Sequence, residues 1–282
     1  MRKVVVLLVG VVLLAAANAS AGVSIKLTGG LGYLLSGDYD RSLRGAYDAI
    51  LASTTDVEGD FKPFRASFRS GLEILVPFGR NIEIGLGGGY ESLNVDNRFR
   101  YFWLFVTLED AIESRLTVVP ITLNIHTSTR LGRRLGLDLF GGPGYYSLRF
   151  RHFQSTETDF FAFTDTREFE SRTGTLGFQG GAALEYALSP GLDLILQADG
   201  RLVRLRELKG DLNDSTSWFL GESAARTPDA SFWVYDATVG TKSFPLGTFA
   251  VAAPAGSEMS NIRSAGLDLS GFGISAGLRL RF

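Results

Sequence analysis

Hydrophobic and polar residues alternate with a period of two along eight stretches of the chain. In the last stretch, apolar side chains occupy the even positions from Phe272 to Phe282, and Gly, Ser or Arg occupies the odd positions. Successive side chains of a β-strand point to opposite faces, so this pattern predicts strands with one apolar face and one polar or small face. The eight stretches cover residues 23–35, 64–76, 82–90, 117–126, 135–146, 176–188, 192–202 and 272–282.

The connections between these strands are alternately short and long. The short ones are residues 77–81, 127–134 and 189–191, and the other four are long. The closing strand has the length of a tilted strand that crosses a membrane, roughly 9–11 residues. We therefore predict an all-β fold, an eight-stranded antiparallel up-and-down transmembrane β-barrel with short periplasmic turns and long extracellular loops.

The long connections leave two points open. Residues 42–53 have a mixed helical periodicity that indicates a short surface helix. The segment Arg206–Ala265 is long for a plain loop and contains a possible hairpin, residues 231–239 and 244–253. If that hairpin crossed the membrane, the barrel would have ten strands; we prefer eight, because the polar face of the hairpin is weak.

Composition supports an exported β-protein. The chain has 282 residues, and its mean hydropathy of +0.12 is too low for a bundle of membrane helices. Residues 1–21 combine a basic start, an apolar run and small residues, as in a Sec signal peptide, which leaves 22–282 as the barrel domain. Cysteine is absent, so closure of the barrel rather than disulfides would stabilise it. The net charge of −2 gives no indication of nucleic-acid binding.

The inward faces of the predicted strands carry charges of both signs. Eight strands enclose an interior that side chains just fill, and a buried charge without a partner costs several kcal/mol. We therefore predict a network of ion pairs in the lumen rather than a wide pore. The predicted network consists of Lys26, Arg65, Arg69, Glu73, Glu83, Glu91, Asp138, Glu185, Asp193, Asp199, Arg201, Arg279 and Arg281.

A Gly-x-Gly-Tyr motif recurs near the outer ends of three strands. Its tyrosines are Tyr33, Tyr90 and Tyr145. Each lies on the apolar face, where the amphipathic rings of an outer aromatic girdle are expected.

The end of the chain resembles the C-terminal assembly signal of bacterial outer-membrane β-barrels. Ser275, Gly277, Leu280 and Phe282 stand at the places of its polar, glycine, hydrophobic and final aromatic residues. Residues 119–125 and 140–146 are similar to paired strand motifs of the broad outer-membrane β-barrel domain family, of the OmpA-like transmembrane and OmpW-like type. The resemblance covers residues 22–282. It implies a monomer in the bacterial outer membrane that contacts lipids and lipopolysaccharide, and the barrel-assembly machinery and periplasmic chaperones during biogenesis.

Three functions are weighed for such a barrel. The filled interior and large loops favour a structural or surface-interaction role. The aromatic loops, and the OmpW-like resemblance, leave a narrow channel or transporter for small, hydrophobic molecules as the alternative. An enzyme is disfavoured, because neither His126 nor His152 lies near a recognisable set of Ser and carboxylate residues.

We assign no catalytic, cofactor-binding or metal-binding residue from the sequence, and we expect no cofactor. Two acidic pairs are candidate metal ligands, Asp38 with Asp40 and Asp211 with Asp214. Acidic pairs in loops are more often solvated surface than ion sites, and we interpret them so.

Overall fold

The computed structural model describes residues 22–282 apart from 55, 104–105, 159–162 and 219–220. The predicted signal peptide, residues 1–21, therefore lies outside the described residues. Among the residues described, no helix is long and apolar enough to cross a membrane.

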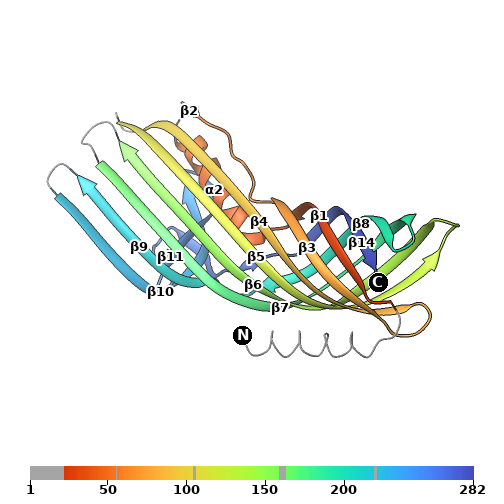
Figure 1. The fold of residues 1–282 in the computed structure, drawn as a ribbon. Coiled ribbons are helices and arrows are strands. Elements are labelled where there is room, and N and C mark those ends of the chain that lie inside the picture. Colours follow the sequence, from red (N-terminus) through yellow and green to blue (C-terminus); the bar gives the residue numbers. More distant parts are fainter. Residues whose placement is uncertain (1–21, 55, 104–105, 159–162, 219–220) are drawn as a thin grey trace.

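Eight antiparallel strands close into a hydrogen-bonded ring (Figure 1). Each strand pairs with its neighbours along the chain, β8 pairs with both β7 and β14, and β14 pairs with β1. The eight strands predicted from alternation are thereby confirmed. They are β1 (Ser24–Leu34), β3 (Ala66–Pro77), β4 (Ile82–Trp103), β5 (Val106–Arg130), β6 (Leu135–Thr158), β7 (Phe163–Ser189), β8 (Leu192–Leu205) and β14 (Gly271–Arg281).

Four of the ring strands continue far beyond the ring (Figure 1). β4, β5, β6 and β7 have 22, 25, 24 and 27 residues. The loops predicted over residues 94–115 and 151–173 are mostly extensions of these strands, which is a correction of the sequence interpretation. The extensions stay paired with one another to within a few residues of their tips, so their backbone groups remain hydrogen-bonded.

The segment between β8 and β14 completes this extension. β9 (Lys209–Trp218) pairs with the outer part of β7, and β10 (Gly221–Val239) pairs with β9, β11 (Lys242–Ala250) and β12 (Met259–Ser264). The candidate hairpin of a ten-stranded barrel is thus β10–β11, and it lies in the outer sheet rather than in the ring. Two short strands, β2 (Val57–Glu58) and β13 (Leu267–Asp268), pair with β4 and β8.

The helix α2 (Gly37–Ser53) packs against β11 and β10. It begins earlier than the predicted surface helix, and its first turns bury Tyr39 and Leu43. Gly45 lies so close to the backbone of Pro245 that a Cβ atom would collide with the Pro245 carbonyl. Close packing of this helix on the sheet therefore depends on glycine. We call α2, the extensions of β4–β7 and the strands β9–β12 the outer cup.

The long strands reverse their amphipathic character where the ring meets the outer cup. In β4, the positions that face outward are even-numbered throughout, and those that face inward are odd-numbered. In the ring, Ile82, Ile84, Leu86 and Tyr90 face outward, and Glu83, Gly85, Gly87 and Glu91 face inward. In the cup, Asn94, Asp96, Arg98 and Arg100 face outward, and Leu93, Val95, Phe99 and Tyr101 face inward. The ring has a polar interior and the cup a hydrophobic core.

Candidate functional site: a salt-bridged lumen beneath a closed cup

The lumen near the short turns is organised by Arg279 of β14. Its guanidinium donates to Glu185 on β7 at 2.9 Å, to Glu83 on β4, and to Ser24 on β1 at 3.1 Å. Its side chain is 3% exposed. Arg281 adds ion pairs to Glu185 at 3.0 Å and to Asp193 at 2.8 Å. One arginine therefore joins three strands across the interior, and five charges lie in one contiguous layer.

The middle of the lumen is built around His126 on β5. Its Nδ1 lies 2.8 Å from Asp138 and its Nε2 lies 3.0 Å from Glu73. A ring that donates to two carboxylates carries a positive charge. Lys26 lies 4.0 Å from each of the same carboxylates and 4.9 Å from the centre of the Phe140 ring. With His126 protonated, two positive and two negative groups balance one another in this layer.

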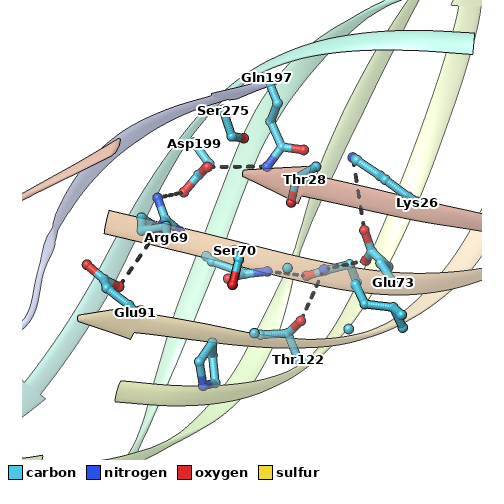
Figure 2. A pocket seen from close by; sticks show the side chains of 18 of the residues that line it. Lys26, Thr28, Arg69, Ser70, Glu73, Glu91, Thr122, Gln197, Asp199 and Ser275 are labelled. Carbon is cyan, nitrogen blue, oxygen red and sulfur yellow. Dashed lines mark hydrogen bonds and ion pairs between the residues drawn. The ribbon is translucent and has the colours of Figure 1, made fainter. Parts of the chain in front are cut away.

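The outer layer of the lumen joins four charges, of which Arg69, Glu91 and Asp199 are labelled in Figure 2. Arg69 pairs with Asp199 at 2.7 Å and lies 3.8 Å from Glu91 Oε2, and Arg201 donates to the same oxygen of Glu91. Arg201 also donates to the Leu269 carbonyl at 2.7 Å. The arginines of β3 and β8 are therefore held against carboxylates of β4 and β8.

A cavity of about 90 Å³ separates the outer layer from the middle layer. Arg69, Glu73, Thr122, Gln197 and Asp199 line it, as Figure 2 shows. Its walls include the glycines of β3 and β4, and it is large enough for a few water molecules. The cavity is polar because its lining is the inward face of the ring.

Twelve of the thirteen predicted lumen residues lie inside the ring, and each of them has an ion-pair partner. Arg65 does not lie inside the ring. Arg65 precedes β3, and its guanidinium donates to Asp40 of α2 at 2.7 Å and to the Tyr33 hydroxyl at 2.8 Å. The prediction assumed that alternation begins at Phe64, but pairing of β3 begins at Ala66. Phe64 instead turns into the core of the cup, which rotates Arg65 to the rim.

An apolar layer closes the lumen above the outer ion pairs. Its side chains come from β1, β4, β5, β6 and β8 and are at most 3% exposed. They are Leu34, Leu93, Leu116, Val118, Leu148 and Val203. Above them, Tyr39 of α2 packs edge-on against Phe64, Phe150 and Phe232. The outer end of the lumen is thus filled by a dry core.

A polar trio is enclosed in this core. The Tyr39 hydroxyl lies 2.5 Å from Ser114 Oγ and 2.7 Å from His152 Nδ1. Burial, and then the positive charge of Arg167, lower the pKa of His152 to about 3. Burial also raises the pKa of Tyr39 above its ordinary value. Sequence reasoning did not connect these residues, because they are 75 and 113 positions apart.

The acidic pairs considered as metal ligands have arginine partners. Asp38 accepts two hydrogen bonds from Arg263, at 2.6 and 2.7 Å, and these lower its pKa. Asp40 accepts from Arg65, Asp211 from Arg226 at 3.0 Å, and Asp214 from Arg167 at 3.0 Å. Among the described residues, no group of three or more potential metal-binding side chains is assembled.

The sequence motifs occupy definite faces of the ring. Ser275 and Gly277 of the chain-end motif face the lumen, while Leu280 faces outward and Phe282 is exposed at the end of β14. Tyr33 and Tyr90 face outward, and Tyr33 stacks on Phe272 with ring centres 5.3 Å apart. Tyr145 also faces outward, next to Leu176 on β7.

The chain matches no protein family and no curated protein. Its fold is similar to the outer membrane protein OprG of Pseudomonas aeruginosa, with 10% identity, a TM-score of 0.40 and coverage of 93% and 96% of the two chains. It is similar to a major outer membrane protein of Thermus thermophilus, with 10% identity, a TM-score of 0.39 and coverage of 92% and 99%. It is also similar to the outer membrane protease OmpT of Escherichia coli, with 12% identity, a TM-score of 0.28 and coverage of 94% and 98%. Likeness at this level carries no activity over to this chain.

Proposed function

We propose that this protein is a monomeric, non-conducting β-barrel of the bacterial outer membrane whose outer cup serves a structural or surface-interaction role. The short turns at residues 77–81, 127–134 and 189–191 lie in the periplasm, and the outer cup lies outside the cell. Export by the Sec pathway follows from the signal-like residues 1–21. The chain end at Ser275, Gly277, Leu280 and Phe282 supports recognition by the barrel-assembly machinery, after escort by periplasmic chaperones.

The outward face of the ring supports the membrane location. Its exposed side chains are large and apolar on every strand, and exposure of this kind suits hydrocarbon rather than water. Examples are Leu31 at 70%, Leu176 at 76%, Leu202 at 72% and Ile274 at 61% exposure. Closure of the ring leaves no unpaired strand edge in its described residues, which a spanning sheet requires.

The observation that carries the non-conducting assignment is the apolar layer above the ion pairs. A hydrated ion would have to displace buried side chains such as Leu93, Val118 and Leu148, and break the pairs of Arg201 and Arg279 below them. Both steps are costly, because the charges would lose their partners in a low-dielectric interior. No catalysis is proposed, because the Ser114–His152 pair is buried beneath Tyr39 and no carboxylate of the described residues hydrogen-bonds to it.

Single-channel recording tests the proposal. Pure refolded protein, shown to be inserted by its heat-modifiable gel mobility, is added to a planar lipid bilayer in parallel with a general porin. The proposal predicts a silent bilayer under conditions where the porin gives steps. Reproducible steps from the pure protein would replace it with the narrow OmpW-like channel or transporter.

A further inference from the structure

A cluster of arginines lies on the outward face of β5, β6 and β7, just beyond the apolar surface of the ring. In the sheet register, Arg149 of β6 lies opposite Arg172 of β7, and Arg151 of β6 lies opposite Arg115 of β5. All four guanidinium groups therefore belong to two adjacent rows of one surface. Nothing in the lumen uses them, because they point away from it.

The charge of these two rows is unbalanced. Glu170 accepts hydrogen bonds from Arg149 at 2.9 Å, from Arg151 at 3.1 Å and from Arg172 at 2.9 Å. Arg115 has no ion pair among the described residues. Within these two rows, four arginines and one glutamate leave three positive charges, and the carboxylates of Glu113 and Glu168 lie in the next row, farther from the ring. The side chains of Arg149, Arg151 and Arg172 are 43%, 45% and 70% exposed, so donors remain available to a ligand.

An apolar surface continues directly below the arginines. Next toward the ring come Val119, Ser147 and Gly174, which lie opposite one another, followed by Tyr145 and Leu176, which are also paired. A surface hollow is lined by Thr117, Val119, Tyr145, Arg149 and Arg172. A Cβ atom at Gly174 would collide with the Tyr145 hydroxyl, so the tyrosine lies over the glycine backbone inside this hollow.

We propose that this surface binds a phosphorylated lipid of the outer leaflet, with its phosphate groups on Arg149 and Arg172 and its acyl chains along Val119, Tyr145 and Leu176. The inference rests on the proposed membrane orientation. Guanidinium forks suit phosphate oxygens, and basic residues at a membrane surface attract anionic headgroups. The juxtaposition of an excess positive charge with a lipid-facing apolar strip selects a lipid over a free anion. Glu170 accepts hydrogen bonds from three of the guanidinium groups and so competes with the lipid phosphate for them.

Native mass spectrometry of the full chain in detergent tests this site. The probes are hexa-acylated lipid A with two phosphates and the same glycolipid without phosphates. The wild type is expected to prefer the phosphorylated probe by about tenfold or more. The double variant R149Q/R172Q is expected to lose that preference, whereas R98Q/R100Q is expected to keep it. The control removes the same charge from exposed positions of β4 that lie farther from the ring.

Several results would overturn the proposal. One is equal affinity of the wild type for both probes, and another is an equal loss in the two double variants, which would indicate unspecific charge attraction. Displacement of the lipid by inorganic phosphate at matched phosphate concentration would identify a free-anion site instead. Preserved heat-modifiable mobility of each variant ensures that a loss of binding is not a loss of folding.

Replacement of Glu170 separates a lipid site from a surface ion-pair network. In E170Q the three arginines lose their internal anion, so lipid A is expected to bind a few times more tightly. Weaker or unchanged lipid binding in this variant would contradict the proposal. Conductance by the wild type would refute the closed barrel without affecting these binding measurements, so the two proposals fail independently.

Discussion

The ring and the outer cup are built from the same long strands, but the apolar side chains face outward in the ring and inward in the cup. In the ring part of β5, Val119, Leu123 and Ile125 face outward and are exposed, whereas Asn124 and His126 face inward and are buried. In the cup part of the same strand, Glu109, Glu113 and Arg115 face outward, whereas Ile112 and Leu116 face inward. The backbone alternation is the same in both regions, so the chemistry of each face is set by the medium outside it. In the proposed membrane location, hydrocarbon outside the ring favours apolar side chains there, and water outside the cup favours a hydrophobic core.

The ring should depend most on its buried ion pairs. Arg279→Leu leaves the carboxylates of Glu83 and Glu185 without their main partner inside the lumen, which costs about 3–5 kcal/mol. We expect loss of the heat-modifiable gel mobility, or its loss at a much lower temperature. Arg98→Leu, on the exposed face of the cup, is the matched control and should change little. Equal behaviour of the two variants would mean that the lumen charges do not hold the ring together.

The cup should depend most on apolar packing. Tyr39→Ala removes a fully buried ring from between Phe64, Phe150 and Phe232, at a cost of about 3 kcal/mol. We expect the cup to become sensitive to protease while the ring keeps its heat-modifiable mobility. The control Tyr47→Ala affects a half-buried residue of the same helix and should leave the cup resistant. Loss of the ring in Tyr39→Ala would show that the two regions fold as one unit.

Acid should weaken the cup through His152. Burial, and then Arg167, lower the pKa of His152 to about 3, while the unfolded side chain titrates near 6.5. The unfolded state therefore binds more protons between these values, and stability falls as pH drops below 6.5. The loss is about 2 kcal/mol between pH 7 and pH 5.

Hydrogen exchange measures this effect locally. Amides of residues 148–153 should exchange faster at pH 5 than at pH 7, after correction for intrinsic rates, with His152→Gln flattening the difference. Amides of β8 inside the ring serve as the internal reference. An identical pH response in the wild type and the variant would contradict a neutral, buried His152.

The ring was predictable because its alternation is strong and its interior must balance charge. Lys26 and Glu73 even face each other in register. The partners of Arg279 were not predictable, because its contacts with Glu83 and Glu185 cross the lumen and depend on strand stagger. The lumen position predicted for Arg65 is wrong because the alternation is irregular at Phe64, which moves the following residue from the inward face to the rim.

The cup was missed because the prediction required apolar residues on the outward face. In β4 the alternation continues beyond Tyr90. In the cup, the apolar residues Leu93, Val95 and Phe99 occupy odd-numbered, inward-facing positions, as Glu83 and Gly85 do in the ring. A reversal of polarity at constant parity is therefore the signal that a strand leaves the ring and continues in the cup. The trio of Tyr39, Ser114 and His152 carried no such signal, because it is formed by packing of a helix on distant strands.

A labelling scan along β6 tests the reversal most directly. The chain has no cysteine, so single cysteines at the outward positions Leu137, Leu139, Tyr145, Arg149 and Arg151 can each carry a fluorophore in lipid vesicles. We predict quenching by brominated lipid, but not by aqueous iodide, at the first three positions, and the opposite at the two arginine positions. Lipid quenching at Arg149 and Arg151, or iodide quenching at Leu139, would contradict a strand that changes its outside medium just beyond Tyr145.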